Sequence, residues 1–222
     1  MHVLFVCTAG RCRSPMAAAL LEKHLGAVTS RMSVSSGGLM VAGTPMPPIG
    51  VSLMAERGID LSSHVSAQVT EHSLAAADIV LGMTREHVRE VVAISPDAWP
   101  KTFTLKDFVR RAEGHTRGRH QRVADWLDSV GAERERYDVL GADPEDDVRD
   151  PFRQRSRVWD RVIREVDELV TRVVPTLGVS RPEPHGDHEE RPRTQDASAS
   201  SQDLRPGQRR RHRLRLRAAQ PL

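Results

Sequence analysis

Two residues near the start of the chain, Cys7 and Arg13, could together perform phosphoryl transfer. A cysteine thiolate is a strong nucleophile, and the planar guanidinium of arginine donates to two phosphate oxygens at once. Ser14-Pro15 follows immediately and is typical of a helix start, so the intervening Thr8-Ala9-Gly10-Arg11-Cys12 would lead into a helix N-terminus. The free N–H groups and partial positive charge of such an end favour both a bound phosphate and the thiolate form of Cys7. We therefore expect Cys7 to attack phosphorus.

The element that must position Cys7 is the apolar run before it, from which we predict a strand over residues 2–6. A buried parallel strand would bring Cys7 to the C-terminal edge of a sheet, where α/β proteins bind ligands. Ser14 is predicted to be the N-cap of the helix that follows, over residues 14–25. The spacing of Cys7 and Arg13 is a weak signal by itself, because the chain has thirty arginines. The alternative is that Cys7 is a small buried hydrophobic residue and Arg13 a solvated one.

Apolar strand-like runs alternate with amphipathic helical patterns through the first 175 residues. This alternation predicts an α/β fold: a three-layer sandwich with a central, mostly parallel four-stranded sheet and helices on both faces. Further strands are predicted at 32–36, 78–82 and 101–104, and further helices at about 47–57, 71–76, 84–94, 105–112 and 158–173. The polar stretch 113–136 is predicted to be a surface excursion, with a short helix at 121–130.

Composition limits the domain organisation and the compartment. Two cysteines five residues apart cannot staple a domain, and no run approaches the ~18 apolar residues of a membrane span. Because no leader precedes the first strand, we expect a cytoplasmic protein. We predict a catalytic domain over 1–175 and a disordered, arginine-rich tail over 176–222, whose composition cannot support a core. The run Arg205 to Arg217 could contact a polyanion or an anionic membrane; alternatively, the tail is solvated and has no fixed role.

The segment Cys7 to Pro15 resembles the phosphate-binding loop of the low-molecular-weight protein tyrosine phosphatases, which also carry it at the N-terminus. The second hallmark of that family is an Asp-Pro-aromatic element far downstream, which Asp150-Pro151-Phe152 matches. The similarity extends over residues 1 to about 175, with the elements in the same order. It also includes Val34-Ser35-Ser36-Gly37-Gly38, Gly58-Ile59-Asp60-Leu61 and Ala77-Asp78-Ile79-Val80-Leu81-Gly82-Met83.

The resemblance implies a two-step mechanism through a cysteinyl-phosphate, with no metal and no cofactor. Cys7 would be the nucleophile, and Arg13 with the loop N–H groups would hold the phosphate oxygens. Asp150 would act first as general acid and then as general base. A rival Asp-Pro pair at Asp143-Pro144 lacks the following aromatic residue, so we prefer Asp150.

The resemblance also implies a set of substrate-binding residues: Thr8, Ala9, Gly10, Arg11, Cys12, Ser14, Met40 and Phe152. Ser14 would donate its hydroxyl to the Cys7 sulfur. Cys12 would either pack at the base of the loop or capture an oxidised Cys7 as a disulfide. The chain departs from the family at three of these positions. Gly10 replaces a bracing asparagine, and Arg11 replaces a commonly aliphatic residue. Met40 belongs to the run Leu39-Met40-Val41, where many relatives carry an aromatic residue that stacks on phosphotyrosine.

The expected activity is hydrolysis of phosphomonoesters, with phosphorylated protein tyrosine as the preferred substrate. A small phosphomonoester is an alternative substrate, and Arg11 should repel a phosphorylated guanidinium. An arsenate reductase shares this fold and loop, but it would need further cysteines after Cys12. A non-catalytic phosphate-binding regulator is a further alternative, which the joint presence of Cys7, Arg13 and Asp150 argues against.

Overall fold

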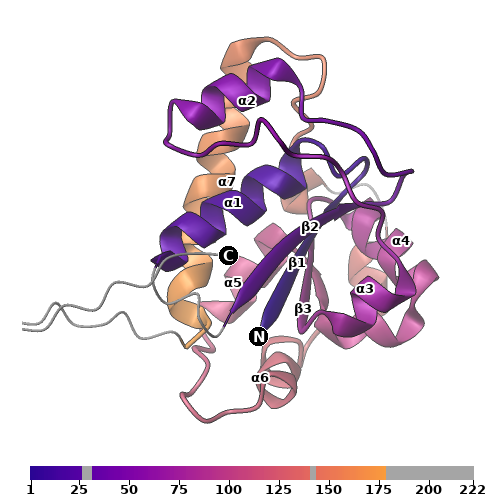
Figure 1. Ribbon diagram of the computed structural model, residues 1–222. Coiled ribbons are helices and arrows are strands. Elements are labelled where there is room, and N and C mark those ends of the chain that lie inside the picture. Colours follow the sequence, from indigo (N-terminus) through magenta and orange to yellow (C-terminus); the bar gives the residue numbers. More distant parts are fainter. Residues whose placement is uncertain (27–31, 141–143, 179–222) are drawn as a thin grey trace, which may run out of the picture. The chain divides into compact units, whose positions relative to one another are not determined.

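The computed structural model describes residues 1–26, 32–140 and 144–178 (Figure 1). Within these residues, a sheet of four parallel strands in the order β2-β1-β3-β4 forms the centre, as predicted. The strands are β1 (His2–Cys7), β2 (Ser33–Gly38), β3 (Ile79–Gly82) and β4 (Thr102–Thr104). The register pairs Cys7 with Gly38, and Val6 with Gly82, so the C-terminal ends of β1, β2 and β3 meet at one edge.

Helices cover both faces of the sheet because its central strands, β1 and β3, are apolar on both faces. In β1, Val3 and Phe5 belong to one hydrophobic cluster, whereas Leu4 and Val6 belong to another on the opposite face. The helices are α1 (Arg13–Leu25), α2 (Pro48–Ala55), α3 (Glu71–Ala76), α4 (Arg85–Ile94), α5 (Leu105–Ala112), α6 (Val123–Val130), α7 (Ser156–Thr176) and the 3-10 turns η2 (Pro96–Lys101), η3 (Arg136–Val139) and η4 (Pro144–Asp146). Helices α1, α5, α6 and α7 contribute to the first cluster, and α3 and α4 to the second (Figure 1). The predicted three-layer α/β sandwich is confirmed.

The start of α1 differs from the sequence prediction. The helix begins at Arg13 and its N-cap is Cys12, so the prediction that Ser14 caps the helix was wrong. The reason is that the Ser14 side chain is fully buried and hydrogen-bonds to the Cys7 sulfur and to the Gly37 carbonyl oxygen. Its hydroxyl is therefore used in the core instead of at the helix end.

The stretch 113–136 was predicted to be a surface excursion with a short helix at 121–130. The helix is present as α6, but it packs on the core, so its assignment to the surface was wrong. Helix α6 buries Trp126, Leu127 and Val130, which lie at helical spacing on one face. The Trp126 ring packs edge-on against Phe108 of α5, with ring centroids 5.8 Å apart. Three apolar residues among many charged ones are enough to attach the segment to the core.

The last helix, α7, is longer than predicted and extends through Pro175 to Thr176. Leu177, the next residue, is completely buried in the first hydrophobic cluster. No helix in the described part of the chain combines the length and the apolar composition that crossing a membrane requires. The Arg205 to Arg217 run and most of the predicted tail lie outside the described residues.

Candidate active site

The loop between Cys7 and Arg13 packs directly on the end of β2, and glycines make this approach possible. A Cβ atom on Gly38 would lie 2.4 Å from the Ala9 carbonyl carbon. Gly10 has a φ of 63°, in the left-handed region that glycine adopts readily. His64 donates from Nε2 to the Gly10 carbonyl oxygen at 2.8 Å, and so fixes the outer side of the loop. Among the described residues, no acceptor is found for the backbone N–H groups of residues 8–12.

Cys7 lies at the base of this loop and is 2 % exposed. Its sulfur is 3.1 Å from the Ser14 hydroxyl oxygen, which also lies 3.1 Å from the Gly37 carbonyl oxygen. Cys12 is a free thiol, as is Cys7. Burial, with the nearby Cys7 as a second cause, raises the pKa of Cys12 to about 12. Cys12 is therefore a protonated thiol at neutral pH.

Arg13 connects the loop to a segment far away in the sequence. Its side chain is 5 % exposed, and its Nη1 donates to the Val148 carbonyl oxygen at 3.1 Å. Its Nη2 donates to the Thr8 hydroxyl at 3.2 Å and to an Asp150 carboxylate oxygen at 2.9 Å. The Nε–H of Arg13 is buried and has no hydrogen-bond partner among the described residues. This donor can serve an anion that enters the site.

A buried histidine supports Thr8 from behind. His87 Nε2 lies 2.9 Å from the Thr8 hydroxyl, and its Nδ1 lies 3.0 Å from the Thr84 hydroxyl. Burial, with a second contribution from the positive charge of Arg13, lowers the pKa of His87 to about 3. The imidazole is therefore neutral at physiological pH, and its two nitrogens link Thr84 to Thr8 and so to Arg13.

The segment that carries Asp150 is fixed to the end of β3 and the start of α4. The Val148 N–H donates to the Met83 carbonyl oxygen at 2.8 Å, and the Arg85 N–H donates to an Asp147 carboxylate oxygen at 2.9 Å. Beyond it, the Phe152 N–H donates to the second carboxylate oxygen of Asp150 at 3.0 Å. These contacts orient Asp150 toward the loop.

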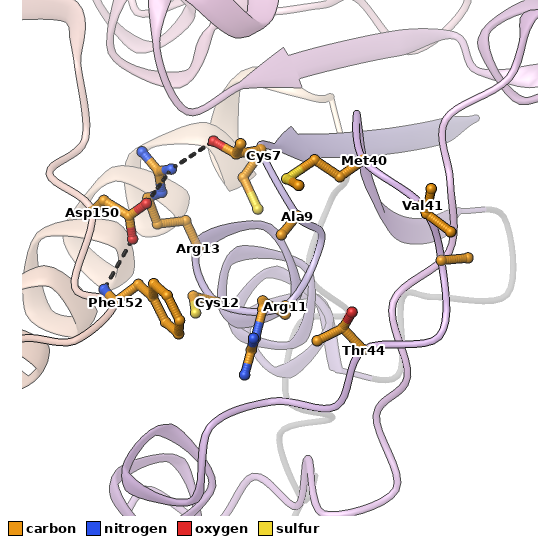
Figure 2. Close-up of a pocket in the computed structure, with 12 residues that line it drawn as sticks. Cys7, Ala9, Arg11, Cys12, Arg13, Met40, Val41, Thr44, Asp150 and Phe152 are labelled. Carbon is orange, nitrogen blue, oxygen red and sulfur yellow. Dashed lines mark hydrogen bonds and ion pairs between the residues drawn. The ribbon is translucent and has the colours of Figure 1, made fainter.

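A cavity of about 500 Å³ opens above Cys7. Its lining consists of Cys7, Thr8, Ala9, Arg11, Cys12, Arg13, Met40, Val41, Ala42, Thr44, Asp150 and Phe152. In Figure 2, Asp150 lies on one side of the cavity and Val41 on the other, with Cys7 between them. The Arg11 guanidinium lies against the Phe152 ring, 4.8 Å from its centroid. Hydrogen-bond donors, a thiol and a carboxylate thus surround one mostly apolar space.

Two residues that the sequence analysis assigned to substrate binding do not line this cavity. Gly10 is turned toward β2, and Ser14 is buried beneath Cys7. Conversely, Val41, Ala42 and Thr44 line the cavity but were not predicted to bind substrate; they follow β2 at the same sheet edge. A signal for them was present, because the segment after a neighbouring parallel strand must pass beside the loop. The rival aspartate, Asp143, lies outside the described residues.

Comparisons with known proteins agree on one family. The family model for low molecular weight phosphotyrosine protein phosphatases matches residues 2–125. A protein-arginine-phosphatase of Geobacillus stearothermophilus is 42% identical over 115 residues, which are 51% of this chain and 74% of the relative. A probable low molecular weight protein-tyrosine-phosphatase, EpsP, of Ralstonia solanacearum is 39% identical over 104 residues, 46% of this chain and 69% of the relative.

The fold agrees with this family as well. The crystal structure of a low molecular weight protein tyrosine phosphatase from T. tengcongensis superposes with a TM-score of 0.61 and 28% identity, over 80% of this chain and 99% of that one. The residues that the family model matches include the strand, loop and helix around Cys7 and Arg13. The chain is a cysteine-dependent phosphatase, and it belongs to the low molecular weight phosphotyrosine protein phosphatase family.

Proposed function

We propose that this phosphatase hydrolyses phosphotyrosine in proteins, with Cys7 as nucleophile, Arg13 as phosphate ligand and Asp150 as general acid and base. The observation that carries this assignment is the convergence of the three side chains on one cavity, although Arg13 and Asp150 are 137 positions apart in the sequence. The phosphate oxygens would be held by the Arg13 Nε–H and by the N–H groups of residues 8–12, which have no other acceptor among the described residues.

In the first step, the Cys7 sulfur attacks phosphorus, forming a P–S bond as the P–O bond to the tyrosine oxygen breaks. Asp150 donates its proton to that oxygen, so the leaving group departs as a neutral phenol. The Ser14 hydroxyl lies between the sulfur and the Gly37 carbonyl oxygen. The Ser14 hydroxyl can donate its proton to the Gly37 carbonyl oxygen while it accepts from the Cys7 thiol, or it can donate to the Cys7 thiolate. It therefore supports both protonation states of Cys7.

In the second step, the Asp150 carboxylate removes a proton from water, whose oxygen attacks phosphorus from the side that the phenol left. The P–S bond breaks, inorganic phosphate forms, and Cys7 returns to the thiolate. Arg13 and the loop N–H groups stabilise the negative charge on the phosphoryl oxygens in both transition states.

The cavity walls favour an aromatic ester. Ala9, Met40 and Val41 provide apolar surface beside the phosphate site, and Phe152 offers a ring face. A phenyl ring can fill this space without leaving polar groups unpaired. The Arg11 guanidinium at the wall is attracted to aromatic ring faces, as its contact with Phe152 illustrates.

A second candidate substrate is phosphoarginine, because the Geobacillus relative that is 42% identical is a protein-arginine-phosphatase. In this chain, however, Arg11 lines the cavity and would lie near the guanidinium of such a substrate. Two positive charges in one cavity repel each other, more strongly where protein excludes water. We therefore rank phosphotyrosine first.

The test compares one peptide carrying either phosphotyrosine or phosphoarginine, with wild type, Cys7→Ser and Arg11→Ala. We expect wild type to release phosphate faster from phosphotyrosine, and Cys7→Ser to release none from either peptide while still binding phosphate. Arg11→Ala should raise kcat/KM for phosphoarginine relative to phosphotyrosine. Preference of wild type for phosphoarginine would reverse the ranking, and turnover by Cys7→Ser would exclude the cysteinyl-phosphate.

We also propose that the catalytic domain ends with α7 and that the rest of the chain is dispensable for catalysis. The test is a truncated chain without the tail. Because Leu177 is buried, this chain should end after Gly178 instead of at residue 175. The truncated chain should keep its melting temperature and its aryl-phosphate kinetics. If the arginine-rich run binds polyanions or anionic lipid, only that binding should be lost, and it should weaken with salt. A melting temperature lowered by many degrees would contradict this boundary.

A further inference from the structure

The segment around Asp150 carries an unusual concentration of unpaired positive charge. Arg149, Arg153, Arg155 and Arg157 are all exposed, and none has a carboxylate partner among the described residues. The four arginines lie within nine positions of one another, in the segment that carries Asp150.

Two guanidinium groups are held at the mouth of the cavity by one aromatic ring. The Arg11 guanidinium lies 4.8 Å from the centroid of Phe152, and that of Arg153 lies 5.3 Å from it. Phe152 is 38 % exposed, so this arrangement is open to solvent. Arg11 and Phe152 also line the cavity, which places the pair beside any residue whose phosphate reaches Cys7.

The backbone at Arg153 adopts a conformation that side chains disfavour. Its φ is 59°, and it is the one non-glycine residue with a positive φ in the described part of the chain. It lies in a turn closed by the Gln154 N–H and the Pro151 carbonyl oxygen, 2.9 Å apart. Glycine would adopt this conformation without strain. Strained positions cluster at functional sites, and the residue strained here is the one whose guanidinium lies 5.3 Å from the Phe152 ring centroid.

We propose that Arg11 and Arg153, stacked on Phe152, form a subsite for a negatively charged group adjacent to the phosphorylated residue. This inference rests on the proposed function and specifies its substrates further. They are phosphorylated protein segments with a carboxylate or a second phosphate next to the target residue. Among the described residues, Asp150 is the only carboxylate that lines the cavity, and it is paired with Arg13. No unpaired carboxylate of the described lining would therefore repel an incoming anion.

The test uses phosphotyrosine peptides that differ only beside the phosphotyrosine: glutamate, glutamine or phosphoserine. We expect kcat/KM of wild type to be about five- to tenfold higher with glutamate than with glutamine, and the advantage to shrink at high salt. The phosphoserine peptide decides whether a second phosphate serves better than a carboxylate. Equal kcat/KM for the glutamate and glutamine peptides would overturn the proposal.

Arg153→Gly is the informative variant, because it removes the cation and relieves the strained backbone. It should lose most of the preference for the acidic peptide while hydrolysing nitrophenyl phosphate, which has no flanking residues, at the wild-type rate. Arg119→Gly is the control, because it removes the same charge far from the cavity. The neighbouring Arg117 N–H donates to the carbonyl oxygen of Thr176, at the C-terminal end of α7. That end of the helix lies about 30 Å from Arg155, which precedes its first residue. This control should keep the preference, and retention of the preference in Arg153→Gly would contradict the subsite.

Binding to Cys7→Ser separates this inference from the proposed function. Fluorescence anisotropy with the same peptides measures affinity without turnover, and the glutamate peptide should again bind about five- to tenfold more tightly than the glutamine peptide. If nitrophenyl phosphate is not hydrolysed by wild type, the proposed catalysis fails, but the two affinities still decide the subsite. Equal affinities would exclude it.

Discussion

Replacement of His87 should remove a specific pH dependence from the stability of the fold. His87 is 2 % exposed, and burial, reinforced by Arg13, lowers its pKa from 6.5 to about 3. In the unfolded chain the imidazole regains its ordinary pKa and binds a proton as the pH falls below 6.5. The unfolded state then binds more protons than the folded state, so the free energy of unfolding decreases from neutral pH toward the folded pKa.

The magnitude follows from the two pKa values. Between about pH 7.5 and pH 5.5, the free energy of unfolding should fall by about 1.4 kcal/mol because of His87 alone. Carboxylates contribute little in this window, because their ordinary pKa values lie near 4. His87→Gln keeps a polar group beside Thr8 but does not titrate, so its free energy of unfolding should change by less than about 0.4 kcal/mol over the same window.

The assay is equilibrium unfolding in urea at three pH values across this window, for wild type, His87→Gln and His115→Gln. His115 is exposed, so His115→Gln is a matched control and should keep the wild-type pH dependence. If wild type and His87→Gln lose stability in parallel as the pH falls, His87 accepts a proton in the folded protein and the reasoning is refuted.

Three further predictions concern the loop and the acid. Asp150→Asn should lower kcat by about 10²–10⁴-fold for phosphotyrosine and less for a nitrophenyl ester, whose leaving group needs little protonation; equal losses would deny Asp150 the role of general acid. Gly38→Ala should lower the free energy of unfolding by at least about 2 kcal/mol in urea titrations, because its Cβ would lie 2.4 Å from an Ala9 backbone atom; an unchanged midpoint would show that the loop can move away. Peroxide should inactivate wild type reversibly, as a Cys7 sulfenic acid condenses with the Cys12 thiol and releases water. In Cys12→Ser, further peroxide should oxidise the unprotected sulfenic acid to the sulfinic acid, which added thiol cannot reduce, so activity should not return. Equal recovery would leave Cys12 as a packing residue.

Local signals were sufficient to predict the sheet and the elements around the nucleophile. The apolar strand before Cys7, the glycine in the loop and the apolar stripe of α1 lie within 25 residues, so their interpretation needed no long-range contact. The helix start was wrong by one residue, because Ser14 has two competing uses. A serine at this position can cap a helix or bond a buried sulfur, and the choice depends on whether Gly37 lies nearby.

Long-range contacts are where sequence reasoning was insufficient. His64 and His87 follow no ligand spacing, and their partners, Gly10 and Thr8, lie 54 and 79 positions away. Trp126 was assigned to the surface because charged neighbours obscured its helical spacing. Its burial depends on Phe108, which provides the apolar surface that it covers. In each case the deciding partner is supplied by another element of the fold.

The contacts of Arg13 have a consequence for how the enzyme exchanges its ligands. A guanidinium that is 5 % exposed would be an uncompensated buried charge if it had no anionic neighbour, and such charges are strongly destabilising. Asp150 is that neighbour, 2.9 Å from Nη2. Under the proposed mechanism, a phosphate that took both Nε and Nη2 of Arg13 would displace the carboxylate from Nη2 and leave it free to act on the leaving oxygen. After the product left, the carboxylate would return to Nη2, so the chain would carry its own tethered competitor for part of the phosphate site.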